Sequence, residues 1–391
     1  MKATALSRRC FLASLSAALP AATAYAAEIT GKGRILPPAA QRYADAATDF
    51  PVTRLTDPAH TSRLPPHYAR AISRHSNFLI FVSDMTGRFE AYRMDLKSGQ
   101  MRQVTEAEDL DPASVALLAD DHGFCYFDGD RLMAANLTNL KAREVYRISD
   151  GFRRAALNLA EDGQYAVVVE KAVVEKAVIE KAVVETRDAT HRLQLVSMAT
   201  GTAKKLVECD EEIRDPLPRP KRASILYARG PANRGNIWLA DYDGQHNYRL
   251  RIADGGTGPA MWSPDGRTVL YLNYPEDSHK LHAIREFTPD ANDDKMIANT
   301  SQFVQFGCNA DASVFVGASG SKASPYVLLL VRAVHREMTL AEHRASDPAM
   351  VAPIFAPNSQ RIFFGSDRHG KPAIYAMSVE KFVEETDADR A

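Results

Sequence analysis

A unit of turn and strand recurs along the chain at a spacing of about 40 residues, which is the length of a propeller blade. Segment 78–106 reads FLIFVSDMTGRFEAYRMDLKSGQMRQVTE, and segment 353–379 reads PIFAPNSQRIFFGSDRHGKPAIYAMSV. Both place an apolar run before Ser-Asp-x-x-Gly and an alternating run containing tyrosine after it. Between them, MWSPDGRTVLYLNY at 261–274 repeats the order of turn and strand.

The residue types in this unit explain the expected local structure. In Ser-Pro-Asp-Gly the proline fixes φ and the glycine accepts a positive φ, so the four residues favour a tight turn. The runs LIFVS, TVLYL and RIFFGS are rich in β-branched and aromatic residues, which favour strands. The predicted blades are 66–106, 110–148, 150–208, 213–253, 257–298, 301–343 and 347–380.

The last of these units lacks an obvious fourth strand. The segment PVTRLTD at 51–57 precedes the first blade and has the character of a strand without a partner. If it pairs with the last blade, the ring closes and leaves no open edge. The sequence therefore predicts an all-β fold, a seven-bladed β-propeller over 51–381 whose N-terminal strand closes the last blade. A pair of β-sandwiches is the alternative, and the recurring turn motif disfavours it.

The first 26 residues have the pattern of an export signal. Lys2, Arg8 and Arg9 precede an apolar stretch at 10–24, and Ala-Tyr-Ala ends the segment with small residues. The twin arginines match a pathway that carries folded proteins. We therefore expect a periplasmic or secreted protein with no membrane span after cleavage, an extension at 27–50 and a tail at 382–391.

Charge and motifs exclude several classes of function. The chain has 48 basic and 49 acidic residues, and we find no sustained basic run, which disfavours nucleic-acid binding. No Gly-x-Ser-x-Gly, P-loop or dinucleotide-binding motif is present. Motifs alone therefore indicate an exported propeller without a recognisable active site.

A five-residue repeat, VVVEKAVVEKAVIEKAVVETR at 167–187, interrupts the third blade. A period of five keeps one apolar face in register neither in a helix nor in a strand. Its Ala, Glu and Lys content and its Lys–Glu pairs four residues apart favour a protruding helix or helix-like hairpin between the second and third strands of the blade. A partner-binding arm with exposed valines is the functional alternative.

The blades resemble the oligogalacturonate lyase family. The resemblance rests on FPVTRLTDP, NIWLADYDGQHNYRL, MWSPDGRTVLYLNY and above all IFAPNSQRIFFGSDRHGKPAIYAM, and it extends over about 50–380. The Pro-Asp-Gly blades alone would also fit TolB-like propellers. The resemblance implies β-elimination on short pectic oligosaccharides, with Mn²⁺ neutralising the uronate carboxylate and a histidine acting as base.

The histidines that this chemistry requires are absent at the matching positions. The base position is occupied by Ala228, and the metal-ligand positions are occupied by Gln305, Asp347, Met350 and Ala352. Losing imidazole ligands should abolish Mn²⁺ affinity. We therefore expect no cofactor, and manganese only if other residues have rebuilt the site.

Two arginines remain as candidates for binding a carboxylate. Arg192 matches an arginine near the substrate site of the family, and Arg229 lies beside the vacant base position. Guanidinium groups bind carboxylates through paired hydrogen bonds, although an ion pair within the blade explains each arginine equally well.

Three hypotheses follow for the function. The first is an exported protein that binds an acidic oligosaccharide or another anionic small ligand at a degenerate lyase site. The second is an active lyase of pectic oligogalacturonides with a rebuilt site. The third is a TolB-like propeller that holds an envelope protein as its partner.

Overall fold

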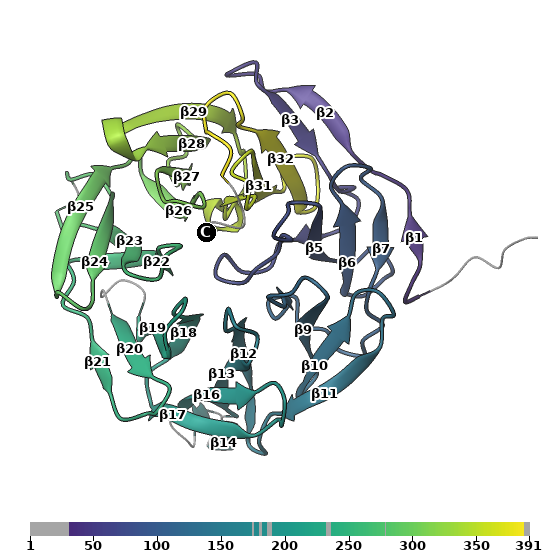
Figure 1. The fold of residues 1–391 in the computed structure, drawn as a ribbon, viewed down its shortest axis with the longest axis vertical. Coiled ribbons are helices and arrows are strands. Elements are labelled where there is room, and N and C mark those ends of the chain that lie inside the picture. Colours follow the sequence, from purple (N-terminus) through teal and green to yellow (C-terminus); the bar gives the residue numbers. More distant parts are fainter. Residues whose placement is uncertain are drawn as a thin grey trace, which may run out of the picture.

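The computed structural model describes residues 31–386 except 174–175, 180–181, 186–189, 232–235 and 278. Seven antiparallel sheets are arranged around a centre, so the chain forms a seven-bladed β-propeller, as the sequence predicts (Figure 1). The described part also contains two short 3₁₀ helices, η2 (Arg332–Val334) and η3 (Pro348–Met350). None of its helices is long and apolar enough to cross a membrane.

The first three blades, each from the centre outwards, contain these strands: β4 (Ser62–Arg63), β5 (Phe78–Ser83), β6 (Glu90–Asp95), β7 (Met101–Gln103) and β1 (Ile35–Leu36); β8 (Ala116–Leu117), β9 (Gly123–Asp128), β10 (Arg131–Asn136) and β11 (Ala142–Arg147); β12 (Phe152–Leu159), β13 (Tyr165–Ala172), β16 (His191–Ser197) and β17 (Ala203–Cys209).

The other four blades, in the same order, contain these strands: β18 (Ile213–Pro218), β19 (Ser224–Arg229), β20 (Ile237–Asp241) and β21 (Asn247–Arg249); β22 (Gly256–Trp262), β23 (Val269–Tyr274), β24 (Ala283–Thr288) and β25 (Asp293–Asn299); β26 (Phe303–Cys308), β27 (Val314–Ser319), β28 (Tyr326–Val331) and β29 (Arg336–Glu342); β30 (Ile354–Phe355), β31 (Arg361–Ser366), β32 (Ala373–Ser378), β3 (Pro51–Arg54) and β2 (Gln41–Ala44).

The ring closes where the two ends of the chain meet. Strand β3 pairs antiparallel with β32, with Thr53 opposite Ala376 and Arg54 opposite Tyr375. Val52 is fully buried in the core of this blade. The closing strand is therefore the one that the sequence predicts. The segment before it was expected to be an extension, and instead its β1 and β2 add a fifth strand to the first and last blades.

The core lies between neighbouring blades, because each sheet is covered on both faces. All six residues of β5 and of β9 are buried, which matches the near-continuous apolar runs of these strands. Each apolar cluster draws side chains from adjacent blades; one, for example, joins Leu226 and Leu239 with Trp262 and Tyr271. Interblade packing thus fixes the blades relative to one another.

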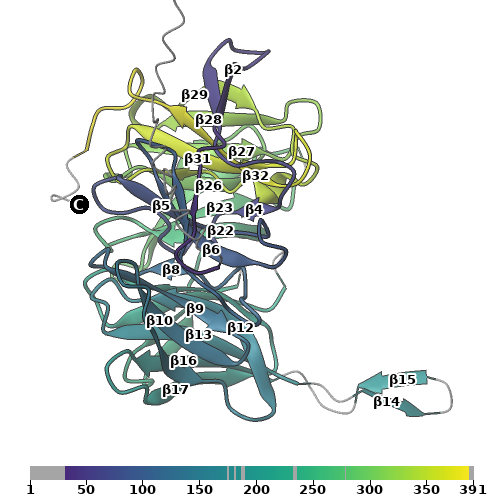
Figure 2. The same cartoon turned by 90° about the vertical axis from the view of Figure 1, so that its right-hand side faces the viewer.

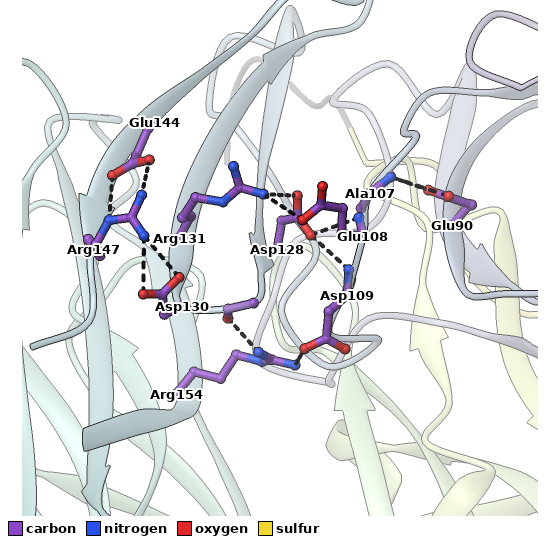
Figure 3. A network of polar contacts seen from close by, with 11 residues as sticks. Glu90, Ala107, Glu108, Asp109, Asp128, Asp130, Arg131, Glu144, Arg147 and Arg154 are labelled. Atoms are coloured by element: carbon purple, nitrogen blue, oxygen red, sulfur yellow. Dashed lines mark hydrogen bonds and ion pairs between the residues drawn. The ribbon is translucent and has the colours of Figure 1, made fainter. Parts of the chain in front are cut away.

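A polar network reinforces the contact between the second and third blades (Figure 3). Arg154 of β12 forms ion pairs with Asp109, at 3.0 Å, and with Asp111, at 3.4 Å, in the segment that enters the second blade. Its guanidinium also donates to the carbonyl of Gly129. Arg131 and Asp128 form a further ion pair at 2.8 Å within the second blade.

The described part of the five-residue repeat is a β-hairpin. Strands β14 (Lys176–Ile179) and β15 (Ala182–Glu185) pair antiparallel and project away from the ring (Figure 2). The helix expected from the sequence is therefore wrong for these residues. Exposed Lys–Glu pairs stabilise a helix by only a few tenths of a kcal/mol each, whereas the valines and isoleucine of the repeat favour strands.

Candidate functional site at one mouth of the ring

The innermost strands run in the same direction through the ring, so their first residues gather at one mouth. There, a cavity of about 440 Å³ lies between the fourth, fifth and sixth blades; we call it the entry cavity. Its lining includes Ala228 and Gln305, so the structure brings the expected base position and one expected metal position into one cavity.

Strand pairing fixes the positions of Ala228 and Gln305 at this mouth of the ring. Ala228 lies near the end of β19 and pairs with Arg214 of the innermost strand β18. Gln305 lies at an irregularity in the pairing of β26 with β27. Its Oε1 atom is buried and has no hydrogen-bond partner among the described residues. A buried amide oxygen without a partner costs free energy, so this atom is poised to accept a hydrogen bond from a ligand or water.

The remaining metal positions do not supply a manganese site. Asp347 caps η3, and its carboxylate accepts a hydrogen bond from the backbone N–H of Ala349 at 2.9 Å. Met350 ends η3, and Ala352 has a backbone φ of 34°. Manganese prefers oxygen ligands such as carboxylates and carbonyls, and the side chains of Met350 and Ala352 supply none. With no imidazole at any of the matched positions and Asp347 exposed, these residues do not fit the ion.

A group of possible metal ligands in the described chain lies elsewhere. The ligand atoms of Asp241, Asp243 and His246 lie within 4.8 Å of one another in the turn between β20 and β21. Asp241 already pairs with His246 at 3.2 Å. None of the three lines the entry cavity, so this group does not rebuild the expected site.

The two arginines expected to bind substrate are paired within their own blades. Arg192 lies 2.7 Å from Glu208 and stacks on Phe152, with 3.9 Å from its guanidinium carbon to the ring centre. Arg229 lies 2.5 Å from Glu211 and stacks on Trp238 at 4.7 Å. Neither arginine lines the entry cavity. Their assignment as substrate-binding residues stays a prediction.

Two residues that sequence reasoning missed do line this cavity. Arg214 donates a hydrogen bond to the carbonyl of Gly230 at 2.8 Å, and its Nε lies 3.6 Å from the exposed carboxylate of Glu212. His67 comes from the segment between β4 and β5, which reaches towards the centre of the ring (Figure 1). No local motif marks either residue: His67 comes from the first blade, and Arg214 faces Ala228 through the pairing of β18 with β19.

His67 is half-buried and lines the cavity, but one nitrogen of its imidazole is covered by protein. Its Nε2 is buried and has no hydrogen-bond partner among the described residues. Burial lowers the pKa of His67, and the nearby carboxylate of Asp215 opposes this shift. His67 is therefore held neutral at neutral pH.

A second hollow of about 820 Å³ adjoins the entry cavity and shares Asn236 and Tyr274 with it. Its lining carries the carboxylates of Glu211, Asp254 and Glu276 against the single guanidinium of Arg249. This charge balance repels an anionic ligand. The entry cavity carries the guanidinium of Arg214 and the carboxylate of Asp215, so it is the less negative end of the combined groove.

Comparison with known proteins places this architecture among the oligogalacturonate lyases. The sequence model of the oligogalacturonate lyase family matches residues 30–328. The chain is similar to an oligogalacturonide lyase of Pectobacterium atrosepticum, with 24% identity over 90% of this chain and 99% of the relative. It is also 22% identical to an oligogalacturonate lyase of Dickeya dadantii over the same shares of the two chains.

Solved structures give the same fold. An oligogalacturonate lyase in complex with manganese superposes with a TM-score of 0.81 at 24% identity, covering 89% of this chain and 98% of that one. An oligogalacturonate lyase from Vibrio parahaemolyticus has a TM-score of 0.80 at 22% identity, covering 89% of this chain and 99% of the other. Because the family model spans most of the chain, the chain belongs to the oligogalacturonate lyase family.

Proposed function

We propose that this protein binds a short uronate oligosaccharide in the entry cavity and does not perform the manganese-dependent elimination that the family resemblance implies. The observation that carries the proposal is the shared lining of this cavity. Ala228 and Gln305 stand where imidazoles were expected, while Arg214 supplies a positive charge at the same place. A guanidinium binds a carboxylate without any metal.

The charges around the cavity suggest the size of the ligand. A carboxylate near Arg214 is stabilised, and the unpartnered Oε1 of Gln305 can accept a hydrogen bond from a sugar hydroxyl. Further uronate units would extend into the neighbouring hollow, where carboxylates outnumber the guanidinium. We therefore expect digalacturonate to bind at least as tightly as longer oligomers.

Calorimetric titration of digalacturonate tests the proposal. Arg214→Ala should weaken binding about tenfold to a hundredfold, because a charge-assisted hydrogen bond contributes about 1.5–3 kcal/mol. Arg267→Ala is the matched control, since that guanidinium is 81% exposed and does not line the cavity. Equal affinity of wild type and Arg214→Ala would refute the role of Arg214, and absence of binding to the wild type would refute the proposal.

Metal analysis tests the second part of the proposal, that the protein does not use manganese. After incubation with Mn²⁺ and desalting, the protein should retain far less than one ion per chain. Retention of one ion at the entry cavity would overturn the proposal, and Gln305→Ala would then show whether that residue holds the ion.

Elimination without a metal is the second candidate function, and His67 is the observation that favours it. A neutral imidazole could take the C5 proton, the electron pair would form the C4–C5 double bond, and the C4–O bond would break, with water protonating the leaving oxygen. We rank it second because protein atoms enclose Nε2 of His67. Ultraviolet absorbance of an unsaturated product, lost in His67→Phe, would establish this activity.

Export to the periplasm and the protein-interaction alternative both stay predictions. The export signal lies outside the described residues. Trapping of the mature protein outside the cytoplasm, with loss of export in Arg8→Lys/Arg9→Lys, would test the location.

A further inference from the structure

We infer that a second site for a carboxylated sugar lies at the opposite mouth of the ring, between the third and fourth blades. A cleft of about 680 Å³ opens there; we call it the exit cleft. It stands apart from the entry cavity and does not depend on the function proposed for that cavity.

The chain direction places the two sites on opposite faces. Strand β18 begins near Arg214, which lines the entry cavity, and Arg219, just beyond its end, lines the exit cleft. In the same way Gln305 near the start of β26 lines the entry cavity, whereas Ala310 beyond its end lines a hollow at the far mouth. That hollow shares Arg74 and Glu161 with the exit cleft, so the two form one groove.

The exit cleft has an excess of positive charge, in contrast to the hollow beside the entry cavity. Its lining carries four cationic side chains and two carboxylates: Arg74, Arg219, Lys221, Arg222, Glu161 and Asp162. Arg219 and Arg222 share Asp290, at 3.5 and 2.7 Å.

Arg74 and Lys221 remain available for a ligand. Both are exposed, and neither side chain forms an ion pair or hydrogen bond with another described residue. They come from the first and fourth blades and meet at one cleft. Two unpaired cations that converge on a concave surface attract an anion.

An aromatic wall suggests that the anion is a sugar acid. Tyr165 and Tyr242 lie edge to face with their ring centres 5.6 Å apart, and both rings remain half-buried in the lining. Such rings offer an apolar surface and a hydroxyl group, the combination found in small-molecule sites. An isolated inorganic anion would use only the cations, whereas a carboxylated sugar uses both parts of the cleft.

The carboxylates next to Tyr242 do not cancel this charge. Asp241 pairs with His246 at 3.2 Å, and Asp243 accepts a hydrogen bond from the backbone N–H of Gln245 at 2.8 Å. Neither aspartate lines the cleft. The ammonium of Lys204 donates to the carbonyls of Tyr242 and Asp243, which adds positive charge nearby.

The backbone at Lys221 permits a clean test. Its φ is 60°, in the left-handed region where a side chain costs energy and glycine does not. The N–H of Arg222 completes this turn by donating to the carbonyl of Arg219 at 3.4 Å. Lys221→Gly therefore removes the ammonium while relieving the backbone, so the variant should melt at no lower temperature than the wild type.

The experiment is calorimetric titration of digalacturonate into the wild type and four variants of the full mature chain, one of which is Arg214→Ala. Lys221→Gly and Arg74→Ala should each weaken one of two binding events at least about fivefold, and 300 mM NaCl should weaken it further by screening. Arg267→Ala, on the same face but outside the cleft, should leave both events unchanged.

Two further ligands show whether the exit cleft recognises a carboxylated sugar, a neutral sugar or any anion. An uncharged galactose disaccharide should not bind at the exit cleft, and inorganic phosphate should bind more weakly than digalacturonate. A single binding event that responds to Arg214→Ala but not to Lys221→Gly or Arg74→Ala would overturn this inference and leave the entry-cavity proposal intact. Phosphate binding as tightly as digalacturonate would also overturn it.

Discussion

His343 illustrates how single side chains constrain this protein. The residue is fully buried near the junction of the last two blades. Its Nδ1 accepts a hydrogen bond from the backbone N–H of Ala345 at 3.1 Å, and its Nε2 lies 3.0 Å from the carbonyl of Ser319. Only the neutral ring with the proton on Nε2 satisfies both contacts. Burial accordingly lowers the pKa of His343.

This pKa shift predicts acid sensitivity. Below the ordinary histidine pKa, the unfolded chain binds a proton at this position that the folded chain refuses, so the free energy of unfolding falls as the pH drops. Urea unfolding at pH 7.5, 6.5 and 5.5 should show this decline. His343→Gln should reduce the pH dependence, and His122→Gln at an exposed position should not. Identical pH dependence in wild type and His343→Gln would contradict the prediction.

For single side chains, the sequence shows which expected site residues are missing but not which other residues line the cavity in their place. Ala228 and Gln305 are visible because the resemblance fixes their place within a blade. His67 could not be found from the sequence because it comes from a different blade, and Arg214 could not because its place opposite Ala228 depends on the register of β18 and β19. The charge partners of Arg192 and Arg229 are equally hidden: the register of β16 and β17 decides the first, and the connection before β18 supplies the second.

Strands pack within and between blades so tightly that one methyl group matters. A Cβ atom added at Gly317 of β27 would lie 2.0 Å from the ring of Phe303 on the paired strand β26. We expect Gly317→Ala to lower the free energy of unfolding by about 1–3 kcal/mol through overpacking. Thermal and urea unfolding measure the change.

A double variant shows whether Gly317→Ala is destabilising because of crowding against Phe303 or because β27 tolerates no substitution at this position. Gly317→Ala combined with Phe303→Leu should cost less than the sum of the two single changes, because the smaller side chain makes room. Strict additivity would show that the aromatic ring does not cause the loss.

The projecting hairpin is expected to be dispensable for folding. A two-stranded hairpin is at most marginally stable by itself, and β14 and β15 pair with each other in a sheet of their own. Replacing 174–189 by Gly-Asn-Gly should change the free energy of unfolding by less than about 1 kcal/mol, since β13 and β16 already pair directly. A loss of several kcal/mol, or of the cooperative transition, would show that the hairpin supports the ring.

Element prediction from sequence succeeded where turn chemistry and apolar runs agreed. The Ser-Pro-Asp-Gly turn lies between β22 and β23, and the strand expected after it is β23. The helix expected in the repeat was wrong because two weak local preferences compete there, and the β-branched residues favour the strands β14 and β15. The strands β1 and β2 escaped notice because two and four residues are too few to show a period.

The stability of the whole ring depends on the pairing of β3 with β32, where the first and last segments of the propeller meet. Removing residues up to 56 would uncover the outer edge of β32 and the core around Val52. We expect this truncation to lower the free energy of unfolding by more than about 3 kcal/mol, whereas truncation at residue 34 should be nearly neutral. Equal stability of the two forms would mean that β3 does not close the ring.

The pairing of β3 with β32 is also delayed during synthesis, because the two strands lie at opposite ends of the propeller sequence. Arg54 pairs with Tyr375, and ribosomes add about 5–20 residues per second, so β3 waits on the order of half a minute for its partner strand. Throughout that interval its edge can accept any other strand. A nascent chain is therefore most vulnerable to mispairing near its beginning, and a chaperone that shields 41–54 until translation ends would raise the yield of closed rings.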